Sequence, residues 1–257
     1  MTMTDKHLAE TQAAPELDVS RADTLLFDLD GTLLPMDEEL FVKLYMHALS
    51  QAFADRYDPA LMQKTLWESV GLMVGNDLDV TNETRLWELM ESRFPGISTH
   101  KEDFDAFYRT GFDAAQPACP RREGTGAFLE ELKKQGWRLI LATNPIFPET
   151  AVRQRLQWAG VDPAIFADIT TYENSTRCKP NPAYYTEILE RNHLDPATCI
   201  MIGNDTSEDM IARSLGMQTF LLTEHLIDRK NLGTDQWPHG DFPALMKAFG
   251  VDTESGN

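Results

Sequence analysis

The chain has 257 residues, of which 42% are hydrophobic and 25% are charged, and this composition is typical of a folded globular protein with one large or two modest domains. Its formal net charge of -18 argues against binding to nucleic acid or to an anionic membrane surface. A small phosphorylated substrate remains compatible with this charge, because a bound divalent cation can reverse the field locally.

The sequence predicts a cytoplasmic protein without a membrane segment. No stretch reaches the roughly 18 apolar residues of a membrane-spanning helix, and the N-terminus lacks the apolar core of a signal peptide. Residues 1–21 show no sustained apolar period and are expected to form a flexible leader or an extension that packs loosely. The three cysteines match no zinc spacing and are expected to be reduced thiols: Cys119, Cys178 and Cys199. The oligomeric state stays open.

The first predicted element is a strand at residues 24–27, which leads directly into Asp28, Asp30 and a Gly31-Thr32 pair. A short apolar run bounded by turn residues is typical of a strand buried on both faces of a parallel sheet, although a buried helical segment gives a similar pattern. Two carboxylates at the end of such a strand suit either a metal ion or paired acid–base chemistry. Alone, this motif could also belong to a calcium loop or a solvated turn.

Residues 36–119 repeat their apolar positions at helical spacing, which predicts several amphipathic helices. This segment is too long for a single crossover, so we expect it to form an all-helical cap domain, with residues 22–35 and 120–250 forming the core. One of its turns, Gly75-Asn76-Asp77, is a candidate for a loop that faces the substrate. Helix breaks are expected at four turn signals: Asp58-Pro59, Gly75-Asn76-Asp77, Pro95-Gly96 and Gln116-Pro117.

Helices and strands alternate beyond residue 120. This alternation predicts right-handed crossovers and a doubly wound parallel α/β sheet, with the catalytic crevice along its carboxyl edge. Strands are expected at 137–142, 167–170, 198–202 and 218–222. Helices are expected at 121–135, 149–158, 181–192, 207–215 and 241–249.

Four polar signatures follow these strands or begin a helix: Asp28/Asp30, Thr143/Asn144, Lys179 and Asp205/Asp209. In a parallel sheet they would all face one edge. They would bring together carboxylates for a divalent cation, two neutral donors and one ammonium group, which is the inventory that phosphoryl transfer needs. Singly, the threonine could be a turn cap and the lysine a solvated side chain.

The four signatures, in this order, resemble the motifs of the haloacid dehalogenase (HAD) superfamily of phosphotransferases. The resemblance covers residues 22–35 and 120 to about 225, and the helical segment between them resembles the cap that this superfamily inserts after the first strand. It implies a HAD-like Rossmannoid α/β core with an inserted helical cap. The stretches LATNPIFP and YENSTRCKPNPAYY resemble those of an uncharacterised bacterial branch, which supplies no substrate.

The resemblance also implies catalytic roles. Asp28 would attack phosphorus and become an aspartyl phosphate, whereas Asp30 would protonate the leaving group and later accept a proton from water. Thr143 and Lys179 would hold the transferring phosphoryl group, with the amide of Asn144 nearby.

Magnesium is the cofactor that the resemblance implies, because all the candidate ligands are oxygen atoms. It would be bound by the Asp28 carboxylate, the Asp30 backbone carbonyl and Asp205, with Asp209 as a direct or water-mediated ligand. The fourth motif departs from the usual Gly-Asp by inserting Asn204 before Asp205. A register in which Asn204 faces the metal is the alternative, and Asp209 could also be an ordinary acid in the first turn of a helix.

The expected function is therefore magnesium-dependent hydrolysis of a small phosphorylated metabolite. Two alternatives remain: a phosphomutase of the same superfamily, and a catalytically idle phosphate-binding protein. The idle protein would be recognised by a lost motif residue, and no motif residue is lost.

Overall fold

The structure is a computed structural model that describes residues 15–251, and a six-stranded sheet forms its centre. All neighbouring strands are parallel, and their order is β3-β2-β1-β4-β5-β6. The strands are β1 Thr24–Phe27, β2 Arg138–Leu141, β3 Asp168–Ile169, β4 Cys199–Gly203, β5 Gln218–Leu222 and β6 His239–Gly240. The chain builds one half of the sheet outward from β1 and then returns to build the other half from β4. This confirms the predicted doubly wound parallel sheet.

Both faces of the sheet are buried, which explains the uninterrupted apolar strands in the sequence. In β1, Leu25 and Phe27 belong to one hydrophobic cluster, whereas Leu26 belongs to a second cluster on the opposite face. Side chains of α5, α6 and α8 contribute to the first cluster, and those of α7 and η6 to the second. The bounds of these helices are α5 Thr125–Lys134, α6 Glu149–Trp158, α7 Pro182–Asn192, η6 Met210–Leu215 and α8 Phe242–Ala248.

Three of these α-helices begin later than the sequence pattern predicted: α5 by four residues, and α7 and α8 by one residue each. The prediction for α5 began at residue 121, but Gly124 has a left-handed φ of 85° and the helix starts after it. The prediction for α7 began at Asn181. In the structure Asn181 caps the helix, accepting a hydrogen bond from Ala183, and Pro182 occupies its first turn.

The helix expected at 207–215 is shorter than predicted and is a 3-10 helix, η6. The preceding turn is held by Asp205, whose Oδ1 accepts hydrogen bonds from the backbone N–H groups of Ser207 and Glu208. Asp205 therefore caps this turn in the way that an N-cap residue caps a helix, and the chain continues from it into the 3-10 helix.

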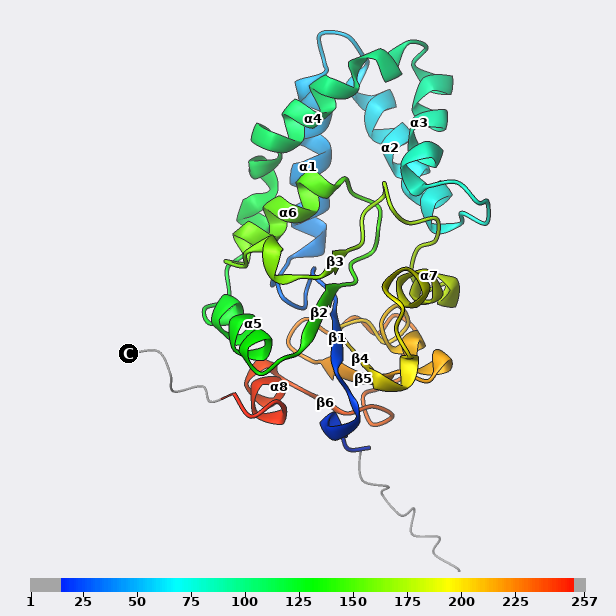
Figure 1. The fold of residues 1–257 in the computed structure, drawn as a ribbon. Helices are drawn as coiled ribbons and strands as arrows, with labels where there is room; N and C mark the ends of the chain where they lie inside the picture. The colour runs from blue at the N-terminus through cyan, green and yellow to red at the C-terminus, as the bar shows by residue number, and fades with distance from the viewer. Residues whose placement is uncertain (1–14, 252–257) are drawn as a thin grey trace, which may run out of the picture.

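The segment between β1 and α5 is helical, as expected, and lies beyond the carboxyl end of β1 (Figure 1). Its elements are α1 Glu38–Ala52, α2 Pro59–Val74, α3 Asn82–Arg93, η2 Ile97–His100, α4 Lys101–Thr110 and η3 Phe112–Ala118. Three of the predicted breaks separate helices. The fourth is wrong, because Pro117 lies inside η3 and the chain instead changes helix type at Gly111, a poor helix former.

Aromatic packing joins the helical segment to the core. Tyr45 of α1 and Phe112 of η3 lie with their ring centroids 5.3 Å from Phe147 and 5.0 Å from Trp158, respectively. A polar contact joins the far side, where Asn82 Nδ2 donates to the carbonyl of Pro145 at 3.1 Å. The segment therefore contacts the core through both aromatic and polar side chains.

The turn Gly75-Asn76-Asp77 takes part in this polar contact with the core. Asn76 Nδ2 donates to the carbonyl of Thr176 at 2.8 Å, and the turn does not line the cavity at the sheet edge described below. It therefore binds the core rather than facing the candidate substrate site.

The described part of the predicted leader includes a 3-10 helix, η1 Val19–Arg21, and Asp18 exchanges hydrogen bonds with Gln218 of β5. Residues 1–14 of the predicted leader lie outside the described residues. The three cysteine thiols are free and buried. None of the helices within 15–251 has both the length and the apolar character needed to cross a membrane.

Candidate active site

The loop after β1 presents Asp28 and Asp30 at the carboxyl edge of the sheet. Gly31 turns this loop with a left-handed φ of 79°, and a Cβ atom there would collide with the side chain of Asn204. That asparagine also accepts a hydrogen bond from Thr32 Oγ1 at 3.0 Å. The first and fourth sequence motifs are therefore packed directly against each other.

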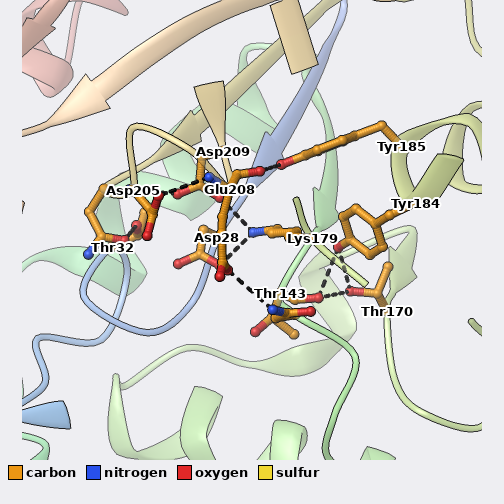
Figure 2. A network of polar contacts seen from close by, with 12 residues as sticks. Asp28, Thr32, Thr143, Thr170, Lys179, Tyr184, Tyr185, Asp205, Glu208 and Asp209 are labelled. Carbon is orange, nitrogen blue, oxygen red and sulfur yellow. Dashed lines mark hydrogen bonds and ion pairs between the residues drawn. The ribbon is translucent and has the colours of Figure 1, made fainter. Parts of the chain in front are cut away.

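Lys179 connects the two motifs electrostatically (Figure 2). Its side chain is 1% exposed, and its Nζ lies 2.8 Å from Asp28 Oδ1 and 2.6 Å from Asp209 Oδ1. Burial opposes the lysine charge, but attraction to Asp209 and Asp28 outweighs burial and holds the pKa of Lys179 well above its usual value. Lys179 is therefore a buried ammonium group between two carboxylates.

The same burial raises the pKa of both carboxylates. The pKa of Asp28 lies above its ordinary value because burial outweighs the attraction of Lys179. Burial raises the pKa of Asp209 to about 7, again against the attraction of Lys179. One ammonium group therefore compensates only part of the negative charge that these two side chains can carry.

The fourth motif is folded around Asp209. Its Oδ2 accepts the backbone N–H of Asp205 at 2.9 Å, and its carboxylate occupies the space that a Cβ on Gly203 would need. The side chain of Asn204 is held in place, since its Nδ2 donates to the carbonyl of His225 at 2.6 Å and its Oδ1 accepts from Thr32. The glycine therefore allows Asp209 to lie against the end of β4.

Thr143 and Asn144, the two polar residues after β2, also lie at the carboxyl edge of the sheet, beside Asp28. The carbonyl of Thr143 accepts hydrogen bonds from Tyr184 at 2.9 Å and from Thr170 at 2.7 Å, which fixes the backbone from which its hydroxyl group extends. Asn144 Nδ2 donates to Glu208 Oε2 at 3.2 Å. Asn144 Oδ1 is buried and has no hydrogen-bond partner within the described residues.

A cavity of about 170 Å³ lies between these motifs. It is lined by Asp28, Asp30, Thr143 and Asn144 together with both acids of the fourth motif, Asp205 and Asp209. Lys179 does not line it, because the lysine lies behind Asp28 and Asp209. Its full lining is Asp28, Asp30, Glu38, Thr143, Asn144, Asn204, Asp205, Glu208, Asp209, Ile227 and Arg229.

Sequence reasoning missed four charged residues at this site: Glu38, Arg155, Glu208 and Arg229. Arg155 of α6 is buried, forms an ion pair with Asp30 and lies 4.5 Å from the centroid of the Phe147 ring. Its position on the apolar face of α6, beside Leu156, was the available signal, because a buried arginine needs a partner. Glu208 and Arg229 gave no comparable signal, since their partners lie far away in the sequence.

The charge of the site and its donor atoms suit a divalent cation. Six carboxylates line the cavity, and three cations are paired with five of them, which leaves an excess of negative charge. All candidate ligand atoms are oxygens, the type that magnesium prefers. The arrangement itself is not yet that of a metal centre: within 15–251, no three His, Cys, Asp or Glu side chains stand together in positions to hold a metal ion.

The reason is that the protein's own cations occupy the candidate ligands. Lys179 binds Asp28 and Asp209, while Arg229 Nη1 binds Asp205 Oδ2 at 2.9 Å. The residues therefore fit magnesium in chemistry and charge, provided that Arg229 releases Asp205.

Comparison with known proteins assigns the chain to a family. The family model described as haloacid dehalogenase-like hydrolase matches residues 22–214. The pyrophosphatase PpaX of Bacillus velezensis is 28% identical over 201 residues, which cover 77% of this chain and 82% of that protein.

Two solved structures share the fold. The HAD phosphatase from Thermococcus onnurineus has a TM-score of 0.57 at 20% identity and covers 90% of this chain and 99% of its own. The HAD-hydrolase YfnB from Bacillus subtilis, bound to magnesium, has a TM-score of 0.55 at 19% identity and covers 90% of this chain and 100% of its own. The matched model, which spans all four motifs, shows that this chain belongs to the haloacid dehalogenase-like hydrolase family, as the motifs predicted.

Proposed function

We propose that this hydrolase is a magnesium-dependent phosphatase that removes the phosphate of a small phosphorylated metabolite through an aspartyl phosphate on Asp28. The observation that carries the proposal is the buried contact of Lys179 with both Asp28 and Asp209 beside a cavity lined by oxygen donors. The relationship to a pyrophosphatase, PpaX, supports the same class of reaction.

Asp28 is the nucleophile in this proposal. Lys179 holds one carboxylate oxygen, Oδ1, so that the other oxygen is available to attack. Attack forms a bond between Asp28 and phosphorus, and the bond from phosphorus to the leaving oxygen breaks. Water then attacks the phosphorus atom, which releases inorganic phosphate and restores the Asp28 carboxylate.

Asp30 moves the protons in both steps. It gives a proton to the leaving oxygen in the first step and takes one from the attacking water in the second. Asp30 lines the cavity with its Oδ2 bound to Arg155, while its Oδ1 is buried and unpartnered among residues 15–251. Arg155 therefore fixes the orientation of the group that carries the proton.

Thr143 and Asn144 line the cavity and bind the phosphoryl oxygens, while the ammonium group of Lys179, which lies behind Asp28 and Asp209, stabilises the charge of the same group. The Thr143 carbonyl is anchored by two hydroxyl groups, so the side chain extends from a fixed backbone. Such preorganised donors stabilise developing charge without reorganising during the reaction.

Magnesium would be held by the Asp28 carboxylate, the Asp30 backbone carbonyl and Asp205, with Asp209 binding directly or through water. When bound, it would neutralise phosphate oxygens and the excess carboxylate charge. The Asp205 register is supported by Asn204, whose amide is already bonded to Thr32 and to the His225 carbonyl.

The helical segment 36–119 acts as a cap over the core of residues 22–35 and 120–250. Its contribution to the site is Glu38, which lies in the first turn of α1 and lines the cavity. Closure of such a segment would exclude water from the cavity while the first bond breaks.

A panel of phosphorylated metabolites assayed for phosphate release tests the proposal. We expect release by the wild-type protein with magnesium, loss on chelation, and turnover near background for Asp28→Asn. Full activity after exhaustive chelation would contradict it. Transfer of the phosphoryl group back to the product, without phosphate release, would instead identify a phosphomutase.

A further inference from the structure

A long loop, residues 223–238, joins β5 to β6 beside the cavity. Its middle is fixed to the fourth motif: Ile227 N donates to the Asn204 carbonyl at 2.9 Å, and Thr206 N donates to the Ile227 carbonyl at 3.0 Å. Thr206 Oγ1 also donates to Asp228 Oδ1 at 2.9 Å. The backbone at Arg229, the next residue, is therefore held at the edge of the site.

The side chain of Arg229 is much less constrained than its backbone. It is 61% exposed, with Nη1 2.9 Å from Asp205 Oδ2 and Nη2 3.2 Å from Glu38 Oε2. These are single bonds to two separate carboxylates, and Nε has no bond to any described residue. The pair with Glu38 is exposed on both sides and contributes little stability, whereas the Asp205 carboxylate is only 8% exposed, so release of the guanidinium group from Asp205 requires another cation in its place.

Arg229 is the one cation among the described residues that line the cavity. Lys179 and Arg155 are each 1% exposed and are bound to carboxylates behind the cavity wall. A substrate that brings a second negative group would meet Glu38 and Glu208 in the same lining and would be repelled without a cation. Arg229 alone can compensate that group.

We infer that Arg229 is a specificity residue, which binds a carboxylate or a second phosphate carried next to the scissile phosphate of the substrate. The inference rests on the proposed phosphatase function and narrows its substrate class. A guanidinium group matches the two oxygens of such a group with parallel hydrogen bonds. A divalent cation bound to Asp205 would compete with Arg229 Nη1 for that carboxylate and would leave the guanidinium group available to the substrate.

Equilibrium binding tests the inference without requiring turnover. Calorimetry in the presence of magnesium would compare phosphonoacetate, which carries a phosphonate and a carboxylate, with ethylphosphonate, which lacks the second charge. We expect the wild-type protein to bind phosphonoacetate at least about tenfold more tightly. Arg229→Gln should remove this preference and leave binding of ethylphosphonate unchanged, whereas Arg229→Lys should keep part of it.

Lys230→Gln is the matched control, because it removes the same charge from an exposed neighbour in the same loop that does not line the cavity. It should keep the wild-type preference. Equal binding of both ligands by the wild-type protein, or a preference that survives in Arg229→Gln, would overturn the inference. The proposed phosphatase function would be refuted by a different observation, namely that the wild-type protein releases no phosphate from any substrate tested.

Discussion

Replacing Glu208 by glutamine should stabilise the magnesium-free protein at alkaline pH. Glu208 lies beside Asp209 and accepts a hydrogen bond from Asn144 Nδ2 at 3.2 Å. A glutamine oxygen can accept the same bond, so the substitution removes the charge while keeping the contact. The wild-type side chain must be ionised at pH 8 in a partly buried position among other acids.

The pKa of Glu208 gives the size of the effect. Burial raises it from 4.5 to about 7, with attraction to Lys179 opposing the rise and repulsion from Asp209 adding to it. At about 1.4 kcal/mol per pH unit, ionisation then costs the folded protein about 3 kcal/mol. The folded state binds the extra proton, so the cost is absent below pH 4.5, grows as pH rises through the interval up to about 7, and is complete above it.

Urea denaturation of both proteins at pH 4.5 and pH 8, with a chelator, measures this difference. We expect equal free energies of unfolding at the lower pH and a more stable Glu208→Gln protein at the higher pH. Magnesium should shrink the gap, because a bound cation compensates the carboxylate. A variant that is equally stable as the wild type, or less stable, at pH 8 would refute the reasoning.

Three further substitutions probe other parts of the site. Asp30→Asn should lower turnover of alkyl phosphates by about 10² to 10⁴, because it removes the group that protonates the leaving oxygen. Phosphorylation of the variant by nitrophenyl phosphate should be less affected, because a good leaving group needs no proton. Single-turnover kinetics would measure both rates. Gly203→Ala should destabilise the protein by about 1–3 kcal/mol in urea denaturation, because the new methyl group displaces the Asp209 carboxylate. Asn82→Ala removes two hydrogen bonds to the core, and hydrogen exchange should rise in residues 75–83 while the central strands stay protected.

The sequence predicted the meeting of Asp28, Lys179 and Asp209 because parallel strands bring their carboxyl ends to one edge. Each residue follows or precedes a strongly patterned element, so its place in the fold follows from topology alone. The same reasoning placed Thr143 beside them. Their chemical roles depend on a bound phosphate and metal and stay predictions.

Other features depended on contacts that no local pattern encodes. Arg229 lies in a loop without periodicity, and its partners Asp205 and Glu38 are 24 and 191 residues away in the sequence. Glu208 is a similar case, because it accepts a hydrogen bond from Asn144, which is 64 residues away in the sequence.

The central claim is that Asp28 carries the phosphoryl group. The most direct measurement is mass spectrometry of the acid-quenched protein after mixing Asp30→Asn with nitrophenyl phosphate and magnesium, since this variant should form the intermediate and hydrolyse it slowly. We predict a phosphoryl group on Asp28, and none when Asp28→Asn is added to the same chain. A phosphoryl group on another residue, or normal turnover by the single Asp28→Asn variant, would contradict the account.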